Sequence, residues 1–187
     1  MEKLQNKYKK EVIPAMMHKF GYKNTMAVPQ IKKVSINTCF GKQAVTKTSG
    51  EREKMQKHIL SDLASISGQK PKLVKSKKSI AGFKLREGLE IATMVTLRKS
   101  KMWDFLERLI YLSFPRSRDF KGLDQKMIDS RGNLNIGFRE HISFPEIFAE
   151  KEKTIFGLEM TVVTNAKTKE EGLELYKLLG FPMKETN

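Results

Sequence analysis

Apolar residues recur at helical spacing in four stretches of the chain. The first covers about residues 1–20 and meets Gly21, a residue type that often ends helices. Pro14 lies inside this stretch, so the predicted helix is either kinked there or starts afresh at that point. The second stretch, residues 52–66, is followed by Gly68 and predicts another amphipathic helix.

The other two helical stretches lie in the second half of the chain. Apolar side chains between Trp103 and Ile110 predict a helix that stops at Pro115, because proline lacks the N–H that a helix interior needs. Thr168 stands three residues before Glu171, which is the spacing of a capping box and predicts the start of the last helix.

Two runs, IKKVSIN and IATMVTLR, instead alternate between apolar and polar residues. Successive side chains of a strand point to opposite faces of the sheet, so each run predicts a half-buried strand with one polar face. The polar positions of these runs include Lys33, Asn37, Thr96 and Arg98, so the two strands offer a polar, partly basic face.

A third region, MIDSRGNLNIGF, predicts a hairpin, because Arg131 and Gly132 separate two alternating runs and glycine tolerates the positive φ of tight turns. LEMTVVTNA predicts a further strand, and the stretch from Phe40 to about Glu51 predicts a loop. The predicted fold class is α+β, with a mainly antiparallel sheet, helices packed on one face and basic loops projecting. We expect one domain over residues 1–187.

The net charge and its distribution along the chain indicate the class of partner. The 187 residues include 36 Lys and Arg against 21 Asp and Glu, a formal net charge of +15. Residues 1–139 hold 30 basic and 12 acidic side chains, whereas residues 140–187 hold 6 and 9. A basic excess of this size, concentrated in one part of the chain, indicates a polyanionic partner, with nucleic acid as the first candidate.

Cysteine content and hydropathy indicate in which cellular compartment the protein works. The single cysteine, Cys39, permits no internal disulfide and favours a reducing compartment. No stretch approaches the roughly 20 apolar residues of a membrane helix, and the first residues lack an apolar signal core. We therefore expect a cytoplasmic protein with no membrane partner.

The strongest local signal is the segment over residues 67–88, SGQKPKLVKSKKSIAGFKLREG. From Leu63 to Arg86 it contains seven cations and no acidic residue, so it would repel itself unless an anionic partner surrounded it. Its glycines allow close backbone approach, and its serines can donate hydrogen bonds to phosphate oxygens. Lysine outnumbers arginine, which favours contacts with backbone phosphates over bidentate reading of bases.

A second basic cluster surrounds Phe120 in the sequence PRSRDFKGL. Such an arrangement can stack a ring or guanidinium on an unpaired base while neighbouring cations hold phosphates, although a lone phenylalanine is more often part of a core. The candidate RNA-contacting residues of this cluster are Arg116, Arg118 and Lys121.

Catalytic and metal-binding chemistry has little support. The three histidines stand apart in the sequence, with no ligand at the spacing of a zinc site, and we expect no metal or other cofactor. Pairs such as Asp62 with Glu87, or Asp119 with Asp124, could hold magnesium, but no spacing singles them out. Phosphate-binding, nucleophile-elbow and dinucleotide-binding motifs are missing from the sequence.

Five long motifs follow one another between about Val28 and Pro182. They are SGQKPKLVKSKKSIAGFKLREG, MVTLRKSKMWDFLERLI, FPRSRDFKGL, DSRGNLNIGFREHISFPEI and LEMTVVTNAKTKEEGLELYKLLGFP. In this order they resemble the motifs of the bacterial form of large-subunit ribosomal protein five. Three local departures are NTCFGKQ in place of a glycine-rich NMGVG, an apparent insertion at Thr46 to Lys57, and a short link between Ile147 and Gly157.

The resemblance implies a structural protein that anchors 5S ribosomal RNA in the central protuberance of the large subunit. By motif it assigns Asn37, Gln69 and Thr96 to that contact, with Lys33 and Arg98 on the same predicted strands. It also implies that the basic segment reaches transfer RNA in the peptidyl site and a bridge to the small subunit. The residues that it assigns to this second contact are Lys72, Lys75, Lys77 and Lys78.

The implied partners are 5S rRNA, 23S-type rRNA, P-site tRNA, neighbouring ribosomal proteins of the central protuberance, and the small-subunit head. The sequence does not distinguish a bacterial from an organellar ribosome. Two rival interpretations come from other classes. One is a metal-dependent RNA-processing enzyme, which metal-dependent turnover of RNA would favour, and the other is a free RNA chaperone, which would not co-sediment with large subunits.

Overall fold

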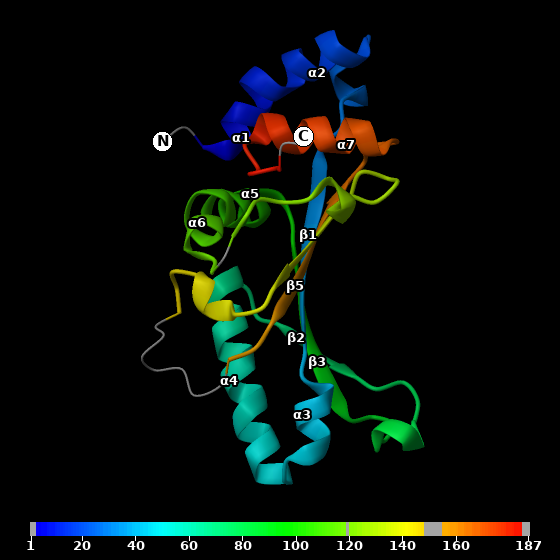
Figure 1. The fold of residues 1–187 in the computed structure, drawn as a ribbon, viewed down its shortest axis with the longest axis vertical. Coiled ribbons are helices and arrows are strands. Elements are labelled where there is room, and N and C mark those ends of the chain that lie inside the picture. The colour runs from blue at the N-terminus through cyan, green and yellow to red at the C-terminus, as the bar shows by residue number, and fades with distance from the viewer. Residues whose placement is uncertain (1–2, 119, 148–154, 185–187) are drawn as a thin grey trace. The chain divides into compact units, whose positions relative to one another are not determined.

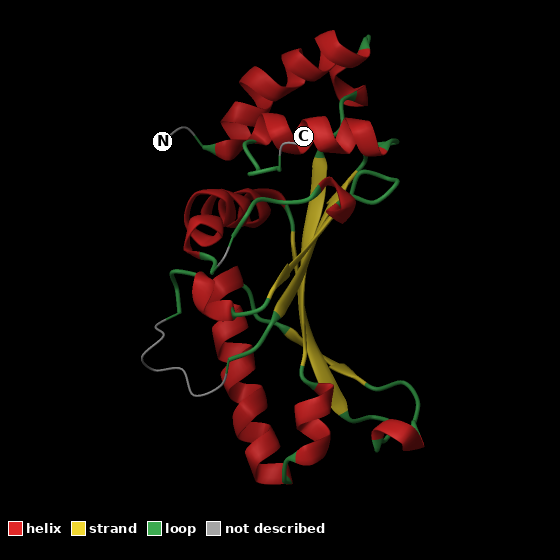
Figure 2. Cartoon of the chain, in the orientation of Figure 1, coloured by secondary structure: helices red, strands yellow, loops and turns green. Residues whose placement is uncertain are grey.

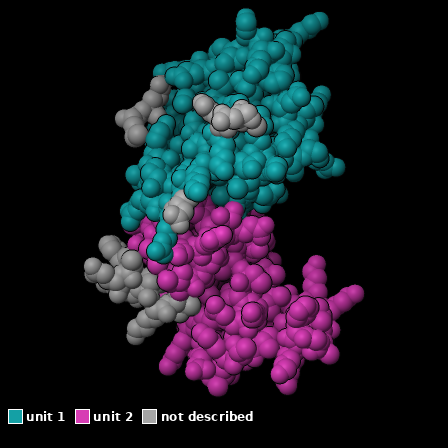
Figure 3. Space-filling model, viewed as in Figure 1, with its two compact units in different colours: residues 1–34, 97–136, 160–187 teal, residues 35–96, 137–159 magenta. Residues whose placement is uncertain are grey.

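The computed structural model of the chain describes residues 3–118, 120–147 and 155–184. The chain forms two compact units, drawn in different colours in Figure 3. Unit 1 comprises residues 1–34, 97–136 and 160–187, and unit 2 comprises residues 35–96 and 137–159. Each unit is therefore built from separated stretches of sequence, and whether the chain folds as one domain stays a prediction.

Five strands form one sheet in the order β2-β3-β1-β5-β4 (Figures 1 and 2). They are β1 (Ile31–Cys39), β2 (Lys72–Lys75), β3 (Glu90–Leu97), β4 (Leu134–Phe138) and β5 (Leu158–Thr164). Strands β2 and β3 pair antiparallel, with Leu73 opposite Thr93 and Lys72 opposite Met94. The predicted α+β class with an antiparallel sheet is confirmed. No helix in the described ranges is long and apolar enough to cross a membrane.

The N-terminal helix of unit 1 has three parts. Helix α1 (Leu4–Lys7) leads into a π-helical turn (Tyr8–Val12) and then into α2 (Ile13–Phe20). Pro14 lies in the first turn of α2, directly after the π-helical turn, where the Ile13 N–H donates to the Tyr8 carbonyl oxygen five residues back. Val12 and Ile13 keep right-handed helical dihedrals, so the chain continues into α2 without the predicted fresh start at this proline. Gly21 ends the helix with φ +68°.

The second helical region of unit 1 runs further than predicted. Helix α5 (Lys99–Arg108) continues through a π-helical turn (Leu109–Ser113) into α6 (Phe114–Arg116). The prediction that Pro115 stops the helix was wrong by one residue. Ser113 and Phe114 keep right-handed helical dihedrals, and the Phe114 N–H donates to the Leu109 carbonyl oxygen five residues back, so the π-helical turn carries the helix into Pro115.

Helix α7 (Lys169–Leu179) begins with the predicted cap. The Thr168 hydroxyl accepts a hydrogen bond from the Glu171 backbone N–H at 3.3 Å. The Glu171 carboxylate in turn accepts from the Lys167 N–H at 2.7 Å, one residue earlier than in a standard capping box. Gly180 ends the helix with φ +92°.

Unit 2 contains α3 (Gly41–Thr46) and α4 (Ser49–Ser67), so the predicted loop from Phe40 to Glu51 was wrong. Thr48 and Glu51 form a capping box that starts α4 three residues before the predicted boundary. Gly, Thr, Ser and Lys residues gave the stretch the composition of a loop, but Thr48 and Glu51 satisfy free N–H groups at the start of α4. Gly68 ends α4 in the left-handed region, as expected.

The predicted hairpin is only partly present. A single bridge joins Ile128 to Leu134, and β4 takes its strand partner from β5. The Asp129 carboxylate accepts hydrogen bonds from the N–H groups of Arg131 and Asn133, both at 2.8 Å. These local bonds compete with strand pairing and turn the first run into a side-chain-closed turn.

Short 3-10 turns complete the connections. They are Thr25–Ala27, Ala81–Phe83, Gln125–Met127 and His141–Ser143.

Candidate nucleic-acid interface

Strand β3 of unit 2 has one buried face and one open face. Thr93 and Val95 are buried, whereas Met94 is exposed and Thr96 is half-buried. Cross-strand partners share a face, so Lys72, opposite Met94, extends this open face onto β2. The open face therefore combines a lysine with the predicted contact residue Thr96.

Gln69 is joined to strand β3 by its side chain. It follows the glycine that ends α4, and its Nε2 donates a hydrogen bond to the Thr96 carbonyl oxygen at 3.3 Å. The Ser67 hydroxyl donates to the Gln69 carbonyl oxygen at 3.0 Å, which holds the backbone where the chain leaves the helix. Two of the three residues predicted to contact 5S rRNA, Gln69 and Thr96, thus lie together.

Asn37 lies on β1, the strand next to β3 in the sheet. Its neighbours Ile36 and Thr38 are buried, and the Thr38 hydroxyl donates to the Gly157 carbonyl oxygen at 2.7 Å. Asn37 itself is half-buried, as expected for the polar side of an alternating strand. It is not sealed in the core.

Lys33 and Arg98 belong to unit 1 and are described there. Lys33 is a half-buried residue of β1, and Arg98 is an exposed residue at the N-cap of α5. Both lie on or directly beside the predicted strands.

The basic segment of unit 2 begins as a strand, because Lys72 and Lys75 lie on β2, a four-residue strand that the loop prediction missed. Beyond β2 the chain projects from the sheet before it returns as β3 (Figure 1). The side chains of Lys72, Lys75, Lys77 and Lys78 are all exposed. These four cations are therefore accessible to a partner, and which partner they contact stays a prediction.

Hydrogen bonds give this connection a defined course. The Ser76 hydroxyl donates to the Lys78 carbonyl oxygen at 2.8 Å, and the Ser79 hydroxyl accepts from the Glu87 N–H at 2.9 Å. At its tip, Phe83 has 74% of its surface exposed. The sequence reasoning did not single out Phe83, although an aromatic residue within a run of cations was a signal available to it.

The second basic cluster, in unit 1, has a different aromatic residue. Phe120 is half-buried and stacks on buried Phe114, with ring centroids 5.0 Å apart and an angle of 20° between the rings. This contact favours a core role for Phe120 over base stacking. Arg116, Arg118 and Lys121 are exposed.

Two histidines of unit 2 approach one carboxylate, contrary to the expectation that they stand apart. The Nε2 atoms of His58 and His141 lie 3.6 and 3.8 Å from Asp62 Oδ2. His141 is fully buried and stacks on Phe156, and its Nδ1 accepts a hydrogen bond from the Phe156 N–H. His58 and Asp62 are four residues apart on α4, a spacing that the sequence does contain, but the approach of His141 depends on the folding of the chain.

Metal binding finds no further support. Over the described ranges, no group of three or more His, Cys, Asp or Glu residues could hold a metal ion. Of the two carboxylate pairs considered from sequence, one includes Asp119, which lies outside the described residues.

The comparison with known proteins decides the family. The model described as "Ribosomal protein L5" matches residues 24–86, and the model of the C-terminus of the same ribosomal family matches residues 90–183. Similar proteins named large ribosomal subunit protein uL5 include those of three bacteria. That of Halothermothrix orenii is 46% identical over 99% of this chain and 100% of its own length. Those of Colwellia psychrerythraea and Clostridium tetani are 48% and 47% identical, covering 99% and 96% of this chain and 99% and 97% of their own lengths.

The chain belongs to the ribosomal protein L5 family. Membership makes it a structural, RNA-binding constituent of the large ribosomal subunit and not an enzyme, so the interpretation as an RNA-processing enzyme falls. Its partners accordingly include the ribosome and ribosomal RNA.

Proposed function

We propose that the open sheet face of this L5 family protein binds 5S rRNA. The observation that carries the proposal is the hydrogen bond from Gln69 Nε2 to the Thr96 carbonyl oxygen, which joins two of the predicted contact residues. Beside them, Lys72 supplies a cation on the same face of the sheet. Polar groups on a sheet can select an RNA shape, while cations neutralise its phosphates.

The test is a filter-binding assay with the double variant Asn37→Ala, Thr96→Ala. Removing two polar contacts should weaken 5S rRNA binding by roughly tenfold. Asn135→Ala with Thr161→Ala makes the same two chemical changes on β4 and β5, where the Thr161 hydroxyl donates to Asn135 Oδ1 at 2.8 Å. Unchanged affinity in the first variant, or equal loss in both, would reject the site assignment.

The exposed lysines of the basic segment form, in this proposal, a separate contact with P-site transfer RNA and the intersubunit bridge. Glutamate at Lys75, Lys77 and Lys78 should impair transfer RNA contact in assembled ribosomes and spare 5S rRNA binding. The control is a triple variant with glutamate in place of Lys167, Lys169 and Lys177, which are also exposed. Loss of both RNA contacts in the loop variant would mean that the segment is not a separate site.

Arg116, Arg118 and Lys121 are proposed to contact ribosomal RNA through its phosphates. Each phosphate contact should contribute roughly 0.7 to 0.9 to the log–log slope of affinity against salt. Alanine at Arg116 and Lys121 should therefore lower the slope for large-subunit RNA by about one to two. An unchanged slope would remove these residues from the interface.

A further inference from the structure

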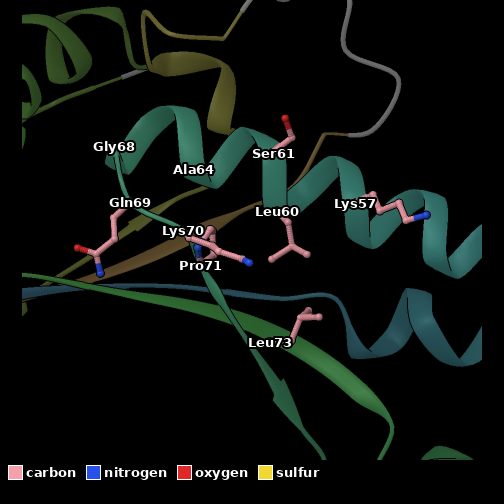
Figure 4. Close-up of a pocket in the computed structure, with 9 residues that line it drawn as sticks. All are labelled: Lys57, Leu60, Ser61, Ala64, Gly68, Gln69, Lys70, Pro71 and Leu73. Carbon is pink, nitrogen blue, oxygen red and sulfur yellow. The ribbon is translucent and has the colours of Figure 1, made fainter.

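Unit 2 has a groove of about 580 Å³ between α4 and the chain that follows it into β2 (Figure 4). Leu60 extends from α4 and Leu73 from β2 toward the same space. Ala64 and Pro71 complete an apolar lining. Leu60, Ala64 and Leu73 are only half-buried, so the groove offers carbon surface that a ligand could cover.

The position of β2 explains why the groove is open. Leu73 lies opposite Thr93, a fully buried residue, and so belongs to the face of the sheet that packs against the core. Yet β2 is the last strand on its side of the sheet. A helix lying over an edge strand leaves an open slot along that edge.

The free edge of β2 suits a polypeptide in extended conformation. Strand β3 occupies one side of β2, and among the described residues no strand occupies the other. An edge strand presents N–H and C=O groups that an added strand can pair with. The alternate side chains of such a strand would point under α4 into the groove.

Charge selects the side chains of the partner. Lys57 and Lys70 line the groove together with its apolar residues, and no acidic residue of the described ranges lines it. Lys72 and Lys75 are exposed on β2 itself. Side chains of the added strand that point away from the groove lie on the same face of the sheet as Lys72. Carboxylates at these positions would meet the ammonium groups of Lys72 and Lys75, whereas cations would be repelled.

We propose that this groove binds an extended polypeptide segment in which apolar side chains alternate with acidic ones. RNA fits the groove less well, because the described residues that line it include no aromatic or arginine side chain on which a base could stack. The proposal goes beyond 5S rRNA binding and rests on the geometry of unit 2. Gln69, one of the residues proposed to contact 5S rRNA, also lines the groove, and its side-chain amide is hydrogen-bonded to the Thr96 carbonyl oxygen (Figure 4).

The test uses an array of octapeptides that alternate glutamate with valine, leucine, isoleucine or phenylalanine. The labelled full-length protein should bind this array and should not bind a matched array with lysine in place of glutamate. The tightest peptide is then measured in solution, where its binding should shift the backbone amide signals of Lys72 to Lys75. Equal binding to both arrays, or unmoved β2 signals, would overturn the proposal.

The matched variants are Ala64→Arg, which fills the groove, and Ser65→Arg, which adds the same side chain at an exposed position of α4. Ala64→Arg should weaken peptide binding by at least about tenfold and Ser65→Arg by less than about twofold. If Ala64→Arg does not fold, Lys57→Glu replaces it, with Lys54→Glu, outside the groove, as the control. Equal affinities within the pair would overturn the proposal.

Binding of 5S rRNA by the same variants separates the two proposals. Ala64→Arg should keep its 5S rRNA affinity while losing the peptide. Loss of RNA affinity in this variant would assign the groove to the RNA surface and overturn the polypeptide proposal. If the unaltered protein fails to bind 5S rRNA, the proposed function is rejected. The peptide measurements would still show whether the groove binds a polypeptide.

Discussion

Two connections of the chain, one in each unit, are both rich in glycine and polar residues, but these residues have different roles in the two. The turn at residues 129–133 in unit 1 bonds its polar groups to its own chain. The basic connection at residues 76–89 in unit 2 leaves its charged side chains exposed. Comparing them separates polar residues that stabilise the fold from those available to a partner.

The turn of unit 1 is closed by hydrogen bonds. Asp129 accepts from both Arg131 and Asn133, and the Asn133 side-chain oxygen accepts from the Thr164 N–H at 3.0 Å. The buried Tyr176 hydroxyl lies 3.0 Å from the Gly132 carbonyl oxygen, and burial raises its pKa, which keeps it a neutral donor. These groups have little capacity left for a ligand.

In the basic connection of unit 2, the hydrogen bonds fix the path of the backbone and do not involve the charged side-chain groups of the lysines. Its serines and the bridge between Ile80 and Leu85 fix where the chain turns. The ammonium groups of Lys77, Lys78 and Lys84 remain at the surface. A cation in this position costs little when free and gains most when a polyanion arrives.

The largest expected effect comes from Gly172→Ala. A Cβ at Gly172 would lie 2.5 Å from the Gly132 Cα, and backbone cannot yield as a flexible side chain can. We expect a loss of about 1–3 kcal/mol or more in the free energy of unfolding, measured by urea denaturation. Gly50→Ala in α4 is the control, because its Cβ meets nothing within 4 Å, and it should stabilise by about 0.5–1 kcal/mol. Equal effects would show that the turn is not tightly packed on α7.

Tyr176→Phe tests the buried hydrogen bonds of the same turn. The hydroxyl lies within bonding distance of the carbonyl oxygens of Gly132 and Val162, so its removal leaves buried acceptors without this donor. The expected loss is about 1–3 kcal/mol. Tyr111→Phe, at an exposed tyrosine, should change stability by less than about 0.5 kcal/mol. A similarly small effect at Tyr176 would contradict the closed-turn interpretation.

Asp129→Asn gives a pH-dependent effect. Burial of the carboxylate works toward a higher pKa, but hydrogen bonds from Asn133 and Arg131 outweigh it and lower the pKa of Asp129 below its ordinary value. A carboxylate with a lowered folded-state pKa stabilises above its unfolded-state pKa, and this stability is lost as pH falls through the folded-state value. The stability difference between wild type and variant should therefore be largest near neutral pH and shrink below about pH 4. Asp104→Asn, at an exposed carboxylate, should show no such trend in urea midpoints taken across this range.

Local chemistry made much of the helical structure predictable. Gly21, Gly68 and Gly180 end helices because a left-handed residue is needed there, and the cap at Thr168 needs only neighbouring residues. Strand β2 was missed because a four-residue strand is stabilised by its pairing with β3, which sequence periodicity does not contain. The hairpin failed for the opposite reason, since the local bonds of Asp129 displaced a plausible strand.

The candidate interface also has a part that the sequence predicts and a part that it does not. The polar faces of β1 and β3 follow from alternation, so Asn37 and Thr96 could be found in the sequence. The hydrogen bond between Gln69 and Thr96 joins residues 27 apart, and the groove needs α4 to lie beside β2. Both depend on packing that no local pattern encodes.

The smallest expected effect is that of Lys77→Glu with Lys78→Glu. Both side chains are exposed, and the hydrogen bond at Lys78 uses its backbone carbonyl oxygen, which the substitution keeps. The free energy of unfolding should change by less than about 0.5 kcal/mol in urea denaturation. A loss above about 1 kcal/mol would show that these cations are partners within the fold, and the contrast between the two connections would fail. A negligible change leaves their charge to a partner, because the sequence from Leu63 to Arg86 contains seven cations and no acidic residue.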